Sequence, residues 1–155
     1  MFDFAQKIFN SAKKSIFNKN MKEVYSNINS AWKFIKLADE YYSQGNKDYS
    51  NGVRLASEYL LDSYKYLSQA TSCIPKYDLE AKMEVVEVIM KIGDPVMYDY
   101  IYPRFRSLYK FKNKKIQKEW EEQVGFFVKY SKKDIEYEKI LKEYPYSSLL
   151  KDFKQ

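Results

Sequence analysis

Apolar residues recur along residues 21–74 at the alternating three- and four-residue spacing of amphipathic helices that pack together. The first stripe consists of Met21, Val24, Ile28, Ala31, Ile35, Ala38 and Tyr42, and the second of Tyr49, Val53, Ala56, Leu60, Ser63, Leu67, Ala70 and Ile74. The segment "SQGNKD" between them has the composition of a tight turn. Two long helices joined by so short a loop must lie antiparallel, so the pattern predicts a helical hairpin over about residues 21–74.

Small residues alternate with large ones along both stripes, which lets two helix backbones approach closely. We therefore expect burial between the helices for Ala31, Ala38, Ala56, Ser63 and Ala70. Asn20, with Glu23 three residues later, is typical of a capping box and predicts that the first long helix begins there. Pro75 predicts the end of the second helix.

Shorter amphipathic segments lie on both sides of the hairpin. In residues 4–18, one face carries Ala5, Ile8, Phe9, Ala12 and Ile16, with Lys7, Lys13 and Lys14 largely off it. Asp78 is placed to cap a helix whose apolar side is Leu79, Met83, Val86 and Met90. Residues 98–112 also have a helical pattern, either as one kinked helix or, because Pro103 disfavours a helical conformation at Tyr102, with a break there and a new helix that begins at Pro103. A further stripe consists of Ile116, Trp120, Val124 and Phe127.

No segment alternates with period two for long enough to predict a strand. The sequence therefore predicts an all-α helical bundle, built on the long antiparallel hairpin with shorter helices packed on it. We expect a single domain over residues 1–155. Its parts are an N-terminal basic amphipathic helix (4–18), the hairpin (21–74) and C-terminal helices within 78–153.

Composition narrows the class of protein. The chain has 155 residues, of which 45% are hydrophobic and 31% charged, as in globular domains. It has no apolar run of about 18 residues and no apolar signal-peptide core. Its single cysteine has no partner for an internal disulfide. These features predict a cytoplasmic protein.

Few catalytic arrangements are compatible with this sequence. Histidine is absent, which removes the usual general base and the commonest zinc ligand. Four glycines form no phosphate-binding motif. Cys73 lies on the apolar side of its helix, as expected of a small buried hydrophobic residue. The composition still allows a Ser–Lys pair. We expect no enzyme, cofactor or metal site.

Charge is distributed unevenly along the chain. Residues 1–20 carry a net charge of +3, residues 21–101 a net charge of −3, and residues 102–115 a net charge of +6, while residues 116–155 are balanced. The strongly basic segment has the sequence "YPRFRSLYKFKNKK" and contains two of the three arginines. Arginine favours bidentate phosphate contacts, so this placement suggests a polyanion.

On a helix, the aromatic residues of this segment fall largely on one face, which we expect to be core. Phe111 stays as a candidate for exposed base stacking. The lysines and arginines then form a ridge over residues 104–115, which we call the basic ridge. The candidate partner-binding residues are Arg104, Arg106, Lys110, Phe111, Lys112, Lys114 and Lys115. This ridge has three alternative roles: it binds nucleic-acid phosphates, it binds an acidic protein, or it is simply exposed to solvent.

The N-terminal segment from Phe2 to Phe17 combines phenylalanines with lysines. Such a helix is suited to a membrane interface, but a helix packed on the hairpin would show the same pattern. The functional prediction is a non-catalytic interaction or assembly protein, with a protein partner or self-association. The first alternative is sequence-independent nucleic-acid binding through the basic ridge. The second is membrane association through the N-terminal helix.

Overall fold

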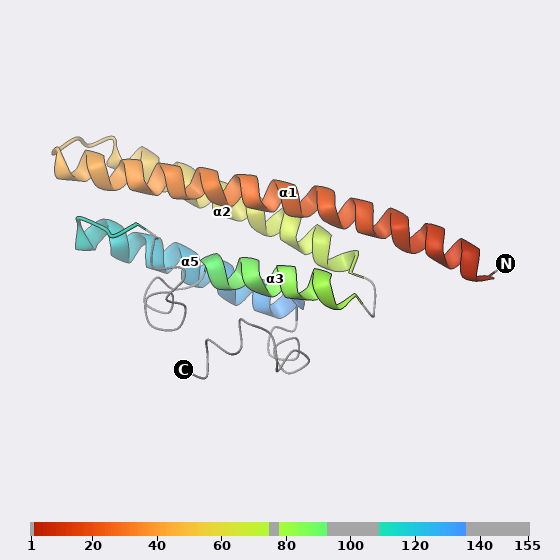
Figure 1. Cartoon of the computed structure of the whole chain (residues 1–155). Coiled ribbons are helices and arrows are strands. Elements are labelled where there is room, and N and C mark those ends of the chain that lie inside the picture. Colours follow the sequence, from red (N-terminus) through yellow and green to blue (C-terminus); the bar gives the residue numbers. More distant parts are fainter. Residues whose placement is uncertain (1, 75–77, 93–108, 136–155) are drawn as a thin grey trace.

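The computed structural model describes residues 2–74, 78–92 and 109–135, and the regular structure of these residues is entirely helical (Figure 1). The helices are α1 (Phe2–Ser43), α2 (Tyr49–Ser72), α3 (Leu79–Ile92) and α5 (Lys114–Ile135). The predicted all-α bundle on a long hairpin is confirmed. The parts of the predicted C-terminal helices within residues 93–108 and 136–155 lie outside the described residues.

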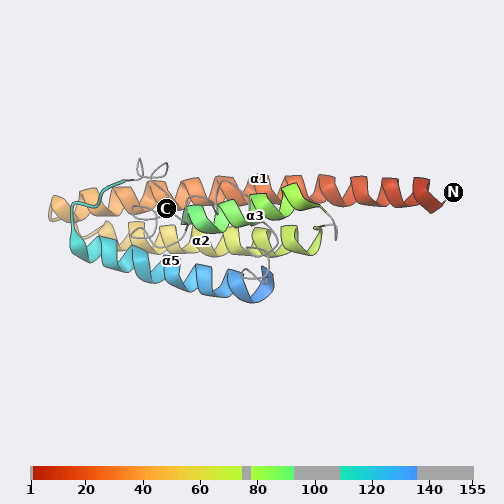
Figure 2. The ribbon, with the colours of Figure 1, turned by 60° about the horizontal axis from the view of Figure 1, so that its bottom comes forward.

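α1 and α2 form the hairpin and run antiparallel (Figures 1 and 2). In the turn, Gly45 has a φ of 71°, a left-handed conformation that favours glycine. All five small residues predicted to lie between the helices are buried: Ala31, Ala38, Ala56, Ser63 and Ala70. The backbones approach closely at Gly52, where an added Cβ would lie 3.0 Å from the Cβ of Ala38. Small side chains therefore set the spacing of the hairpin.

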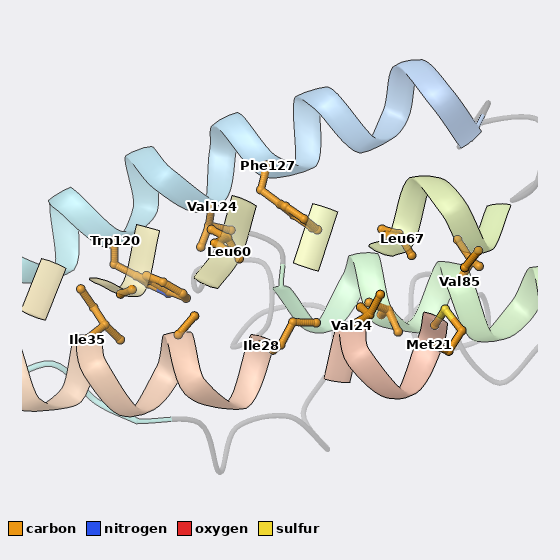
Figure 3. Packing of buried hydrophobic residues seen from close by; sticks show 14 of the residues in the cluster. Met21, Val24, Ile28, Ile35, Leu60, Leu67, Val85, Trp120, Val124 and Phe127 are labelled. Atoms are coloured by element: carbon orange, nitrogen blue, oxygen red, sulfur yellow. The ribbon is translucent and has the colours of Figure 1, made fainter. Parts of the chain in front are cut away.

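α3 and α5 form a second layer on one side of the hairpin (Figure 1). The predicted stripe of α5 is confirmed, since Ile116, Trp120, Val124 and Phe127 are all buried. The ring of Trp120 lies 4.8 Å from that of Trp32, centre to centre. Figure 3 shows that α5 covers Ile35 and Leu60, while α3 places Val85 near Met21.

α3 differs in part from its prediction. Its cap is confirmed, because Oδ1 of Asp78 accepts a hydrogen bond of 2.9 Å from the backbone N–H of Ala81. Its buried side, however, contains Ala81, Val85 and Val88. Met83, which was predicted to face the core, is partly buried and packs against it, while the side chains of Leu79, Val86 and Met90 are not among those described. α3 has apolar residues on most of its circumference, so spacing alone does not identify the inner face.

α1 is one continuous helix where the sequence predicted a boundary. Asn20 does not cap a helix; its Nδ2 donates a hydrogen bond of 3.0 Å to the backbone carbonyl of Ile16, one turn earlier. Asn27 makes the same type of bond to the carbonyl of Glu23, at 2.8 Å. The sequence has no proline or glycine before Gly45. The predicted capping box is therefore wrong, because asparagine side chains are accommodated within the helix.

The first part of α1 extends beyond the end of α2 (Figures 1 and 2). We call residues 2–16 the N-terminal arm. Phe4 is 70% exposed and Phe9 54% exposed, whereas Phe17, the first buried residue among the described side chains of α1, is 2% exposed. The hypothesis that this segment packs on the hairpin is wrong for Phe4, Ile8, Phe9 and Ile16, whose side chains are at least half exposed, whereas Phe17 at its end does lie in the core. In the described part of the chain, no helix is long and apolar enough to cross a membrane.

Candidate functional site

The segment that leads into α5 crosses α1 at Asp39, a carboxylate with no exposed surface. Its Oδ2 accepts hydrogen bonds from the Tyr109 hydroxyl and, at 2.8 Å, from the backbone N–H of Lys112. Its Oδ1 accepts bonds from the backbone N–H of Asn113 at 3.1 Å and from the Asn113 amide at 2.9 Å. The same amide donates to the Ser43 hydroxyl at 2.8 Å. We call this arrangement the Asp39 clasp.

The electrostatics of the clasp favour an ionised carboxylate. Burial on its own raises the pKa of Asp39, but the hydrogen bonds from Tyr109, Lys112 and Asn113 outweigh it and lower the pKa below its usual value. Burial, followed by the bond to Asp39, raises the pKa of Tyr109. Four donors occupy the acceptor positions of the carboxylate. No acceptor position is left for a substrate or a metal ion, so Asp39 has a structural role.

The clasp also explains a wrong prediction. Residues 109–113 are not helical, although the sequence predicted that a helix continues to about residue 112. The backbone N–H groups of Lys112 and Asn113 bond to Asp39 and not to helical carbonyls. Phe111 is partly buried against the core and lies edge-on to Tyr109 at 5.4 Å. Less of its ring is therefore available for stacking than the sequence suggested.

Five of the seven candidate residues of the basic ridge are described, and two of the lysines have partners. Nζ of Lys112 forms an ion pair with Glu40, and this hydrogen bond raises the pKa of Lys112. Nζ of Lys115 donates to the Tyr49 hydroxyl at 2.9 Å, which raises the pKa of Lys115. It also lies 5.0 Å from the centre of that ring.

The remaining members of the basic ridge are two lysines and two arginines. Lys110 and Lys114 have exposed side chains. Arg104 and Arg106 lie outside the described residues. The sequence suggested a ridge without nearby acids, but the fold brings Glu40, 72 positions away from Lys112, into contact with it. The binding function of the ridge stays a prediction.

A groove between α2 and α5 has a volume of about 400 Å³. Leu61, Tyr64, Phe126 and Phe127 are among its lining residues. Leu61 is 47% exposed and Phe126 is 52% exposed, although both are large and apolar. Sequence reasoning missed this groove, but a signal existed. Leu61 follows the buried Leu60 and Phe126 precedes the buried Phe127, so each is an extra apolar residue beside a core position.

Exposed charges of both signs border the groove on α2. Arg54 and Glu58 form an ion pair of 2.7 Å, and Lys65 lies 3.8 Å from Asp62. Arg54, Glu58, Leu61 and Lys65 follow one another at spacings of four, three and four residues. They therefore form one exposed stripe along α2, with an apolar residue between charges of opposite sign.

Metal ligands and a free thiol are the other chemical groups to consider among the described residues. Across residues 2–74, 78–92 and 109–135, no three Cys, Asp or Glu side chains converge as metal ligands do. Cys73 is partly buried and packs against the core. Comparisons with protein-family models, curated proteins and solved structures find no match to this chain. The inference of function rests on the surfaces alone.

Proposed function

We propose that this chain is a non-catalytic assembly module that self-associates through the groove between α2 and α5. The observation that carries the proposal is the exposure of Leu61 and Phe126, both about half exposed, at a groove of about 400 Å³. Because the two side chains line the same groove, they present one joint apolar surface to a partner and not two isolated apolar residues. Burial of these two side chains against another chain removes their apolar area from water, which favours association.

The exposed stripe of α2 supports a second copy as the partner. Consider two α2 helices that meet antiparallel with their Leu61 residues in contact. Glu58 precedes Leu61 by three residues and Lys65 follows it by four, so Glu58 of one copy lies opposite Lys65 of the other. Two-fold symmetry makes this pairing occur twice. The ion pairs within each chain are exposed and contribute little, so exchanging partners costs little.

The absence of histidine and the state of Asp39 support a non-catalytic role. Asp39 is buried and ionised, and its oxygens are occupied by donors from the clasp. A general acid or base needs a pKa near neutrality and access to substrate. Asp39 has neither property.

Nucleic-acid binding through the basic ridge is not advanced as a second function. Lys112 is paired with Glu40, and Phe111 is partly buried. Both observations reduce what the described part of the ridge offers to a phosphate or a base. Nucleic-acid binding by the ridge therefore stays a prediction from the sequence.

Sedimentation equilibrium of the full chain tests the proposal. We expect a reversible dimer, and we expect Leu61→Asp and Phe126→Asp each to raise its dissociation constant at least about tenfold. Leu37→Asp is the matched control, because Leu37 is also a large exposed apolar residue but lies on α1, away from the groove. A wild type that stays monomeric at its highest soluble concentration overturns self-association.

Charge reversal tests the antiparallel arrangement. Lys65→Glu places acids opposite acids and should weaken the dimer, while addition of Glu58→Lys to the same chain should restore it. If the double variant is no tighter than the single one, self-association stands but the antiparallel contact of α2 is wrong. Thermal unfolding of each variant confirms that the fold is intact.

A further inference from the structure

We infer that the N-terminal arm of α1 binds along the surface of an anionic lipid bilayer. The sequence allowed two explanations for its amphipathic pattern, namely packing on the hairpin and contact with a membrane. The exposure of Phe4 and Phe9 removes the first. This proposal concerns a surface separate from the groove and does not depend on self-association.

The apolar side of the arm is continuous. Phe4, Ile8, Ala12 and Ile16 follow one another at intervals of four residues, so they form one row along the helix, and Phe9 lies beside Ile8. Ile8 is 57% exposed and Ile16 is 50% exposed. An interfacial helix presents such an apolar face to the boundary between lipid headgroups and acyl chains.

The charge of the arm selects an anionic partner. Within residues 2–16 the arm carries three lysines against one acid, Asp3, a net charge of +2, and two more lysines follow at positions 19 and 22. Successive residues of a helix differ by about 100° in direction, so Lys7 and Lys13 lie on opposite borders of the row that contains Ile8 and Ala12. Long lysine stems can then reach lipid phosphates while the apolar face is inserted. Like charges oppose the pairing of two arms with each other.

Contact between a lysine and the apolar side is visible within the arm. Nζ of Lys13 lies 4.4 Å from the centre of the Phe9 ring. The lysine stem therefore follows the edge of the apolar face, as it does when such a side chain reaches from an apolar layer to water. This arrangement matches a partner that is apolar inside and anionic at its surface.

The apolar row points away from the second layer of the bundle. Trp32 marks the side of α1 that faces α5, because its ring lies 4.8 Å from Trp120. Ile16 and Ile8 precede Trp32 by 16 and 24 residues and so lie roughly 160° and 120° around the helix from it, while Phe4, nearer the free end, lies roughly 80° around. A flat surface can therefore meet the arm from the side opposite α3 and α5. A bilayer is such a surface.

The hairpin prepares the arm for this contact. An isolated helix of about 15 residues is marginal in water, because it must form its own nucleus. Here the arm continues a helix that is packed against α2 from Phe17 onward. Its helical conformation is thus already formed, which lowers the entropy lost on binding. The arm, about 22 Å long at 1.5 Å per residue, offers one continuous face.

Vesicle flotation of the full chain tests the inference. The wild type should float with vesicles of phosphatidylcholine that contain phosphatidylserine, and much less with phosphatidylcholine alone or at high salt. Phe9→Glu should lower the bound fraction at least about tenfold, because it places a charge in the apolar face. Two control variants should float like the wild type: Phe9→Leu, which keeps the face apolar, and Gln44→Glu, which adds an acid at the hairpin turn.

Three outcomes overturn the inference. The first is a wild type that stays unbound with both kinds of vesicle. The second is equal flotation of Phe9→Glu and wild type. The third is a wild-type dimer that Phe9→Glu dissociates, since the arm is then covered by a second copy. Failure of the groove proposal appears in sedimentation, as a monomeric wild type or as a dimer that Leu61→Asp and Phe126→Asp leave unchanged, and not in flotation, so the two failures are distinguishable.

Discussion

The two parts of α1 share one uninterrupted backbone but have different surroundings. From Phe17 to Ser43 the helix lies beside α2, and its apolar stripe is largely buried. In the N-terminal arm the helix is also amphipathic, yet Phe4 and Phe9 are exposed. Local spacing determines that both parts are helical. Burial depends on whether another element reaches them, which is a property of the whole fold.

The two parts also differ in what their faces are made of. The packed part alternates small residues such as Ala31 and Ala38 with large ones, which suits close contact between two rigid helices. The arm has large side chains at most positions of its apolar face and lysines at the borders. A soft anionic layer accommodates such a face without complementary packing. The composition of each face therefore matches a different kind of neighbour.

The largest expected effect compares two phenylalanines of the same helix. Phe17→Ala should lower the free energy of unfolding by about 3–5 kcal/mol, because it leaves a cavity in the core. Phe9→Ala should change it by less than about 0.5 kcal/mol, since Phe9 is exposed. Urea unfolding measures both values. Equal losses for the two variants would show that the arm is packed after all.

The stability of the hairpin and of α5 on it should also depend on the Asp39 clasp. Asp39→Ala leaves the Tyr109 hydroxyl and the N–H groups of Lys112 and Asn113 without their acceptor, which should cost about 3 kcal/mol. Calorimetric unfolding measures the loss. Asp62→Ala is the control, because Asp62 is in an exposed pair and should cost at most about 1 kcal/mol.

The lowered pKa of Asp39 predicts that the fold loses stability in acid. The pKa of Asp39 is lowered in the folded protein, so its ionised form stabilises the fold at pH values well above the usual 3.8. This contribution is lost as the pH falls through 3.8 toward the folded value. Unfolding measured from neutral to acid pH should show a steeper fall for the wild type than for Asp39→Asn. Parallel curves for the wild type and Asp39→Asn would contradict a lowered pKa of Asp39 in the folded protein.

A larger side chain should destabilise the hairpin but not the arm, with a smaller effect on stability than the changes above. Ala38→Leu should cost roughly 1–3 kcal/mol, because the Cβ of Ala38 already lies 3.0 Å from the position of an added Cβ at Gly52. Ala12→Leu should be nearly neutral, since Ala12 is exposed and leucine is also a good helix former. Melting temperatures compare the two. An unchanged value for Ala38→Leu would mean that the hairpin is not closely packed there.

The smallest effect on stability concerns the basic ridge. Reversal of Lys110 and Lys114 to Glu should change the free energy of unfolding by less than about 0.5 kcal/mol, since both side chains are exposed. If the ridge binds nucleic acid, the wild type is retained on DNA or RNA at low salt, retention falls steeply as salt rises, and the reversal lowers it. Absence of retention at low salt eliminates that hypothesis.

Structure that depends on residues close together in the sequence could largely be predicted, whereas structure that depends on residues far apart in the sequence could not. The stripes of the hairpin and of α5 were predictable, because 3.6-residue periodicity is a local property. The helix through Asn20 was not, since asparagine is suited both to a cap and to a bond with the carbonyl four residues back.

The site features depended on contacts that local patterns do not contain. The Asp39 clasp joins side chains and backbone groups 70 to 74 positions apart. The same long-range approach places Glu40 beside Lys112 and so alters the predicted ridge. The groove formed where Leu61 and Phe126, each next to a core residue, meet from two different helices.

The separation of 70 positions between Asp39 and Tyr109 has a consequence for the order of folding. The turn of the hairpin closes a short loop, so α1 and α2 can associate early. The clasp must close a much longer loop, and it fixes the point at which α5 begins on the hairpin. We therefore expect α5 to dock after the hairpin has formed. Pulsed hydrogen exchange during refolding should protect the amides of α2 before those of α5.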